Sequence, residues 1–292
     1  MTASVRLGGA TVTRVVETKV EMRTSLFADT SPEAWAEHAD LLEPEFWNRA
    51  AEQWRIAMQT WVVQVDGLVV VVDTGVGNGR DRPHMPPLDQ LSTNFLDDFA
   101  QAGFDPASVD VVINTHLHTD HVGWNTQSVN GAWVPTFPNA RYLMPEPDYR
   151  FFCPDGGGFT DATAMVFSDS VFPVSDQIEL WSDGLQPSES LRLRPAPGHT
   201  PGSSVLWLDA GKPAVFVGDL THCPIQLPRP SDPCAFDVDA AAAAVTRKRI
   251  FTEAARARAA VIPAHYPGHG GATIVARGDR FEVDDWLDLP GI

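Results

Sequence analysis

Residues 114–121 read Asn114-Thr-His116-Leu-His118-Thr-Asp120-His121 and form a dense cluster of metal-ligand side chains. Three histidines and one carboxylate fall within six positions, whereas the whole chain of 292 residues has nine histidines. The apolar run Val109–Asn114 directly before them predicts a buried strand, so the cluster lies in the loop at a strand end. Imidazole and carboxylate are ligands that zinc accepts, as do iron, manganese and cobalt. The stretch therefore predicts a metal site.

The order of side chains within this loop indicates two metal positions. Alternation along an extended chain places His116 and His118 on one side. Asp120 and His121 follow where the chain turns back, so they face a neighbouring point. We expect two groups of ligands around two adjacent metals.

Ligand-type residues recur after three later strands. Each would be weak evidence alone, because a single His or Asp after a strand is usually a turn residue. Together they place ligand-type side chains at the carboxyl ends of four strands, which adjacent strands would bring to one edge of a sheet. The three residues are His199, Asp219 and His265, after the predicted strands 190–194, 213–217 and 260–262.

The full pattern resembles the metallo-β-lactamase superfamily. Its parts are His-x-His-x-Asp-His, Gly-His-Thr-Pro-Gly around His199, Gly-Asp at 218–219, and a final His, with Asp73-Thr-Gly upstream. The resemblance implies an α/β fold, namely an αββα sandwich with the metal site at one edge of the two sheets. It also implies a ligand set and an Asp73 that hydrogen-bonds a ligand loop. In that set one metal is bound by His116, His118 and His199, the other by Asp120, His121 and His265, and Asp219 bridges both.

Two departures narrow the resemblance to the dinuclear hydrolases. β-Lactamases of this fold usually carry Cys or Ser where Asp219 stands, and flavodiiron proteins usually carry Glu where His118 stands. Residues 218–227 resemble acyl-homoserine lactonases and methyl-parathion-hydrolase-like enzymes. We therefore expect a hydroxide bridging two divalent metals to open a lactone or cleave another carboxylic ester. Zn²⁺ is the default, with iron, manganese or cobalt as alternatives.

Further residues are assigned to catalysis and to the support of the ligands. Asp120 is expected to pass a proton to the leaving group, as its counterpart is thought to do in relatives. Acyl-homoserine lactonases carry a Tyr three residues after the bridging Asp, and His222 stands there in this chain. We hypothesise that His222 donates a hydrogen bond to the reacting oxygen. His269, four residues after His265, is predicted to contact the ligand residues without binding a metal itself.

Aromatic residues near the ligand motifs predict an apolar pocket. A pocket of this kind favours a small molecule with an apolar acyl or aryl group, an ester or a lactone, over a nucleotide or sugar phosphate. The residues predicted to line it are Trp124, Phe151, Phe152 and Tyr266.

The ligands also bear on domain organisation. Because they span positions 116 to 265, no domain boundary can fall between them, and residues 1–292 are expected to form one domain. A Trp-rich segment over about 31–58 is predicted to be helical, broken at Pro44, and to serve as a lid or a homodimer contact.

Composition excludes several functional classes. The net charge is −17, with 38 acidic against 21 basic residues, which argues against a nucleic-acid partner. No apolar run approaches the ~18–20 residues of a membrane span, and no signal peptide is readable. Three cysteines with no close pair fit reduced thiols in a cytoplasmic protein.

Other functions stay open at this stage. Among enzymes the alternative is a phosphotriesterase or another xenobiotic hydrolase, including a hydrolytic dehalogenase. An RNA-processing nuclease is opposed by the acidic balance. A non-catalytic metal-binding protein is opposed by the complete ligand set.

Overall fold

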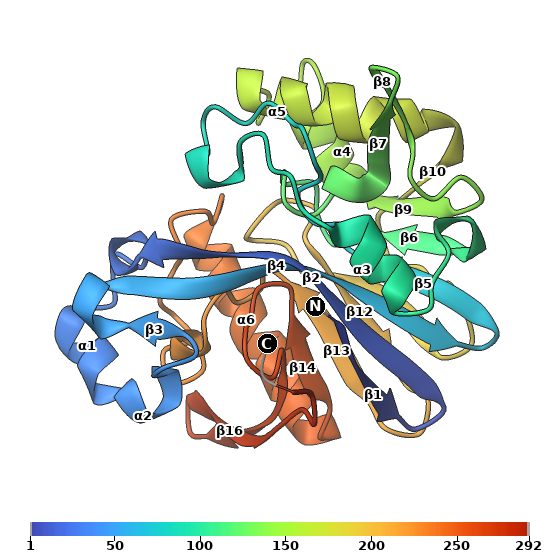
Figure 1. Ribbon diagram of the computed structural model, residues 1–292. Coiled ribbons are helices and arrows are strands. Elements are labelled where there is room, and N and C mark those ends of the chain that lie inside the picture. The colour runs from blue at the N-terminus through green and yellow to red at the C-terminus, as the bar shows by residue number, and fades with distance from the viewer. Residues whose placement is uncertain (1, 291–292) are drawn as a thin grey trace.

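The computed structural model describes residues 2–290, in which two β-sheets stack face to face. Helices cover the outer faces: α6 (Ala240–Ala257) packs on the second sheet, and α3 (Phe95–Gln101) and α4 (Glu146–Phe152) pack on the first (Figure 1). The expected αββα sandwich is confirmed. The remaining helices are α1 (Pro32–Glu37), α2 (Ala39–Leu42) and α5 (Asp161–Val166).

The first sheet is mixed, with antiparallel strands at its amino-terminal end and parallel pairs from β5 onward. A short strand, β3 (Trp47–Asn48), pairs with β4 off the main path. The order is β1 (Thr2–Leu7), β2 (Ala10–Arg23), β4 (Gln53–Val65), β5 (Leu68–Val72), β6 (Val111–Ile113), β9 (Arg141–Pro145) and β10 (Ile178–Trp181).

The second sheet is antiparallel except for the parallel pair β13–β14. A separate hairpin joins β7 (Thr126–Val129) to β8 (Ala132–Pro135). The sheet order is β11 (Leu191–Pro195), β12 (Ser204–Leu208), β13 (Ala214–Gly218), β14 (Ala260–Pro263), β15 (Ala272–Arg277) and β16 (Arg280–Trp286).

Short helical turns connect these elements. One is a π-helical turn, Phe167–Val171, that continues α5. The 3₁₀ turns are Thr24–Leu26, Arg49–Ala51, Pro86–Leu88, Pro106–Ser108, Gly123–Asn125, Phe172–Gln177 and Pro224–Gln226.

Local sequence explains several elements directly. The β4–β5 hairpin turns at Asp66-Gly67, and both residues have positive φ, 53° and 77°, as a tight hairpin of this twist requires. The side chain of Asp239 caps α6 by accepting from the Ala242 N–H at 2.9 Å. That helix then ends at Arg258, whose φ of 50° is left-handed.

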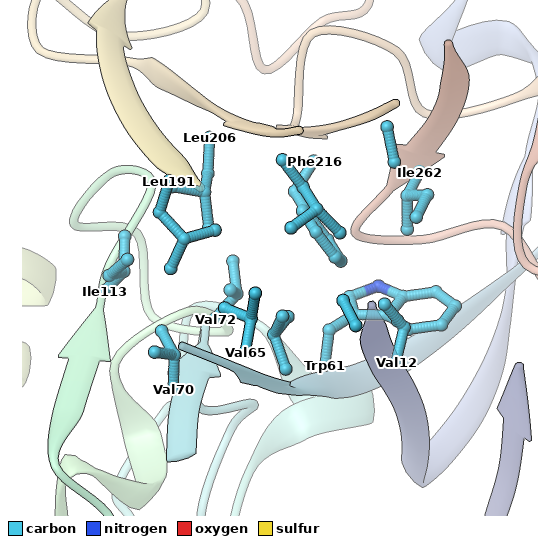
Figure 2. Packing of buried hydrophobic residues seen from close by; sticks show 14 of the residues in the cluster. Val12, Trp61, Val65, Val70, Val72, Ile113, Leu191, Leu206, Phe216 and Ile262 are labelled. Atoms are coloured by element: carbon cyan, nitrogen blue, oxygen red, sulfur yellow. The ribbon is translucent and has the colours of Figure 1, made fainter. Parts of the chain in front are cut away.

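Apolar side chains from both sheets fill the space between them (Figure 2). Val12, Trp61 and Val72 of the first sheet face Leu206 and Phe216 of the second. Burying these surfaces supplies the main stabilisation, at roughly 25 cal/mol per Å² of apolar area. The shared core fixes the two sheets against each other, and so fixes the loops that leave their common edge.

The segment 31–58 is not continuously helical, so that prediction is wrong in its second half. Helix ends at Leu42, and residues from Gln53 onward form the first half of β4, paired with β2. The apolar pattern of this stretch was ambiguous, and pairing with a neighbouring long strand decides such cases. Its tryptophans are buried in a cluster with Phe27, whose ring centroid lies 5.1 Å from that of Trp54. A lid or dimer role stays a prediction.

Within residues 2–290 no helix is long and apolar enough to cross a membrane.

Candidate metal centre

The carboxyl ends of the central strands meet at one edge of the sandwich. In the first sheet β5, β6 and β9 run parallel; in the second, β13 and β14 are parallel and β11 runs the same way because it is antiparallel to β12. The loops that follow these strands therefore converge. They carry the predicted ligands together with Asp73, as expected for residues that follow strand ends.

Three histidines converge on one point. His118 Nδ1 lies 3.1 Å from His116 Nε2 and 3.0 Å from His199 Nε2. The ligand atoms of this group all lie within 4.8 Å of one another. Three imidazole nitrogens at such separations could together hold one zinc ion.

A second group lies beside the first. Asp120 Oδ2 is 3.3 Å from His265 Nε2 and 3.8 Å from His121 Nε2. These three side chains also form a cluster able to hold a metal ion. The loop between His118 and His121 is short, so the two groups are neighbours.

Asp219 stands between the two groups with one oxygen toward each. Its Oδ1 lies 3.0 Å from His265 Nε2 and 3.4 Å from His121 Nε2. Its Oδ2 lies 3.4 Å from His199 Nε2 and 3.8 Å from His116 Nε2. A carboxylate placed in this way can bridge two cations.

The chemistry of the side chains fits metal ions. His121 Nε2 and Asp219 Oδ1 are buried and make no hydrogen bond, although they lie only 3.4 Å apart. Unpaired polar atoms in a protein interior are costly and call for a partner. A divalent cation would satisfy them, and the His and Asp set accepts zinc, iron, manganese or cobalt.

The far nitrogens of the histidines are held by other groups. Asp73 Oδ2 lies 2.9 Å from His121 Nδ1, and its carboxylate also accepts from the Thr115 N–H at 2.7 Å. His265 Nδ1 contacts the Ala57 carbonyl at 3.0 Å, and His199 Nδ1 contacts Asp237 at 3.0 Å. Such contacts fix the ring orientation of metal-binding histidines. The position predicted for Asp73 is seen, but sequence reasoning missed Asp237, because its separation from His199 follows no motif.

Burial and charge shift the protonation of this cluster. Burial lowers the pKa of His118 to about 3, and nearby His199 adds to the effect. Burial opposes protonation of His265, yet the Asp219 and Asp120 carboxylates raise its pKa to about 9. Burial likewise opposes ionisation of Asp219, but His265 and His121 hold its pKa well below its usual range. Asp219 is therefore ionised at neutral pH, the form that binds a cation.

His222 lies against the bridging carboxylate. Its Nε2 is 3.2 Å from Asp219 Oδ2, and its ring centroid is 5.0 Å from that of His199. His222 is buried, and it also lines the cavity above the ligands. His199, His222 and Asp237 make a further group with metal-ligand spacing that the sequence did not predict.

An apolar cavity of about 310 Å³ opens onto the ligands. Asp120, Asp219, His222 and His265 form its polar end. Most of the remaining wall is apolar or sulfur-containing. It includes Met22, Trp54, Ile56, Met58, Phe152 and Phe236.

Several predicted pocket residues lie elsewhere. Phe152 lines the cavity, but Trp124, Phe151 and Tyr266 do not. Trp124 stacks on Phe95 at 5.0 Å and donates from Nε1 to Glu17, and Tyr266 is buried with its hydroxyl 2.9 Å from that of Thr221. The signal for Trp124 and Tyr266 was proximity in sequence to a ligand, and proximity does not fix the direction of a side chain.

Two other histidines lie outside the ligand groups, and one of them differs from expectation. His269 Nδ1 lies 3.1 Å from the Leu287 carbonyl and 2.8 Å from that of Leu289, so it holds the carboxyl-terminal segment and not the ligands. His84, which is exposed, also lines the cavity. Its position depends on how the loop after β5 folds over the site, which its sequence does not reveal.

Comparison with known proteins identifies the family of this chain. The model of the metallo-beta-lactamase superfamily matches residues 58–265, and the chain belongs to that superfamily. It is 29% identical over 149 residues to the N-acyl homoserine lactonase AttM of Agrobacterium fabrum, covering 48% of this chain and 51% of that protein. The AttM lactonase of Azorhizobium caulinodans is 32% identical over 108 residues, 34% of this chain and 36% of that protein. The chain thus spans about half the length, or less, of these curated relatives.

Solved structures show the same fold over nearly the whole chain. AidC, a dizinc quorum-quenching lactonase solved with the product N-hexnoyl-L-homoserine, has a TM-score of 0.78 at 18% identity, covering 97% of this chain and 96% of that one. A probable metal-dependent hydrolase from Staphylococcus aureus has a TM-score of 0.80 at 16% identity, covering 97% and 98%. At these identities the likeness is one of fold.

Proposed function

We propose that this chain is a dinuclear metallohydrolase that opens a lactone or cleaves another carboxylic ester bearing an apolar group. The position of Asp219 carries the proposal, because its two oxygens face two separate groups of ligands. Divalent cations held there would polarise a carbonyl and supply an activated water. We take Zn²⁺ as the default cation. We also propose that residues 1–292 form one domain.

The chain's own side chains supply the remaining functions. Asp120 is 15% exposed against 5% for Asp219, and it lines the cavity, so its carboxylate can pass a proton to a leaving group. The apolar wall suits an acyl or aryl group and disfavours a sugar phosphate or nucleotide. The AttM relatives support a lactone as the substrate.

A substrate panel tests the reaction class. The metal-loaded protein is assayed on acyl-homoserine lactones and aryl esters against paraoxon-type phosphotriesters. We expect turnover of the carboxylic esters or lactones. Turnover confined to the triesters would replace the lactonase assignment with a phosphotriesterase.

We expect His222→Ala to lower kcat/KM about 10²-fold, the usual cost of removing one donor to a developing oxyanion. Its imidazole lies at the cavity end beside Asp219, where the reacting oxygen would sit. Metal content is measured on the same sample. A variant with full metal content and unchanged kcat/KM would refute this role.

A further inference from the structure

Asp148 is a buried carboxylate outside the ligand set. It lies in α4, directly after β9, and its side chain is fully shielded from solvent. Within residues 2–290 no Lys, Arg or His lies within ion-pair distance of it. An ionisable group kept in such surroundings costs stability unless its hydrogen bonds compensate.

Those hydrogen bonds reach two different loops. Asp148 Oδ2 accepts from the Leu117 N–H at 3.0 Å and from the Thr200 hydroxyl at 2.9 Å. Its other oxygen accepts from the Gly202 N–H. Leu117 stands between His116 and His118, and Thr200 follows His199. One carboxylate therefore touches the residues adjoining all three histidines of the first ligand group.

The second loop is shaped to reach this carboxylate. A Cβ added at Gly202 would lie 2.6 Å from Asp148 N and 2.7 Å from Oδ1. Real Cβ atoms do not approach other atoms so closely, so only glycine permits this contact. The loop after β11 thus brings the Gly202 backbone into close contact with Asp148 of α4.

Other contacts on the ligand loop have separate partners. Asp73 accepts from Thr115 and faces His121, on the side of the second ligand group. Ser204 Oγ donates to the Thr115 carbonyl at 2.8 Å and joins the two loops one residue before His116. Asp148 connects Leu117 to Thr200 by accepting a hydrogen bond from each.

We propose that Asp148 is a positioning residue that ties the two histidine loops together and so sets the metal affinity of the group His116, His118 and His199. This role rests on the proposed metal centre. The close approach of His118 to His199 depends on the spacing of the two loops that carry them, 81 residues apart in sequence. Partners that orient ligands in this way typically change metal affinity about 10- to 100-fold when altered.

Asp148→Asn is the sharpest probe, because the side chain keeps its size. Both oxygens accept hydrogen bonds, so an amide NH₂ must face an N–H or hydroxyl donor at one of them. We expect Zn²⁺ affinity at one of two sites to fall about 10- to 100-fold, with the other site within about threefold of wild type. The metal-free protein is titrated with Zn²⁺ against a competing fluorescent chelator.

Asp110→Asn is the matched control, because Asp110 Oδ2 also accepts a backbone N–H, that of Val69 at 2.8 Å, on an exposed position. We expect wild-type affinity at both sites for this variant. The melting temperature of each metal-free variant is recorded alongside. If Asp148→Asn lowers that temperature but leaves both affinities within threefold of wild type, Asp148 is only structural and the proposal is overturned.

If Asp148→Asn fails to fold, Thr200→Val tests the role of Asp148 instead. It removes one of the three hydrogen bonds and keeps the shape of the side chain, and we expect a smaller loss of affinity, about threefold to tenfold, at one site. Unchanged affinity would refute the proposal. A wild-type chain that binds no Zn²⁺ would refute the proposed function as well, whereas two intact sites unaffected by these variants would refute only this role.

Discussion

Replacing Asp219 with alanine is expected to lower kcat/KM at least about 10³-fold and to reduce bound metal below two ions per chain. Its two oxygens lie between the ligand groups, within 3.0 Å of His265 Nε2 and 3.4 Å of His199 Nε2. Removing it would leave both groups short of a ligand and, with two cations bound, would leave their positive charges unscreened at close range. A loss of about 4 kcal/mol of transition-state stabilisation corresponds to that factor. Steady-state kinetics and elemental analysis of one preparation measure both effects.

Asp209→Ala serves as the control for loss of a carboxylate, since Asp209 is exposed in the turn after β12, away from the ligands. It should retain wild-type rate and metal content. An Asp219→Ala protein that holds two metals and reacts within tenfold of wild type would show that Asp219 does not bridge.

The largest effect on stability is expected for Trp61→Ala, at about 3–5 kcal/mol. Trp61 is 2% exposed and lies between the sheets, its ring 6.2 Å from that of Phe216 (Figure 2). Its Nε1 also donates to the Pro263 carbonyl at 3.3 Å, two residues before His265. Urea unfolding should show a lower midpoint at an unchanged slope.

Trp61→Phe separates packing from the hydrogen bond. It keeps an aromatic ring in the core and loses the Nε1 donor, so a loss of about 1–2 kcal/mol is expected. Should Trp61→Ala cost less than 1 kcal/mol, the space between the sheets would not be the main core.

The ligand groups could be predicted because the signal is local and repeated. His116, His118, Asp120 and His121 stand in one short loop, and the later ligands each follow a recognisable strand. A β-strand ends where its apolar run ends, and parallel strands place such ends together. Residue type and strand order are therefore enough to predict that these side chains cluster, without knowledge of side-chain contacts.

The supporting residues could not be predicted in the same way. Asp148 and Asp237 reach the histidine loops from a helix and from an irregular segment, and neither has a fixed spacing from the residue it holds. Trp54 looked helical but lies in β4, because a long antiparallel partner, β2, outweighs local preference. Contacts of this kind depend on how the whole chain packs.

The central claim is that two metals, held by the seven ligands, give the chain hydrolytic activity. It is tested most directly by adding Zn²⁺ stepwise to the metal-free protein and measuring the rate of lactone hydrolysis. We predict no rate above background without metal, and a rise that saturates at two equivalents of Zn²⁺ per chain. Full activity of the metal-free protein would contradict the claim. So would a rate of lactone hydrolysis that saturates although no Zn²⁺ is bound to the chain.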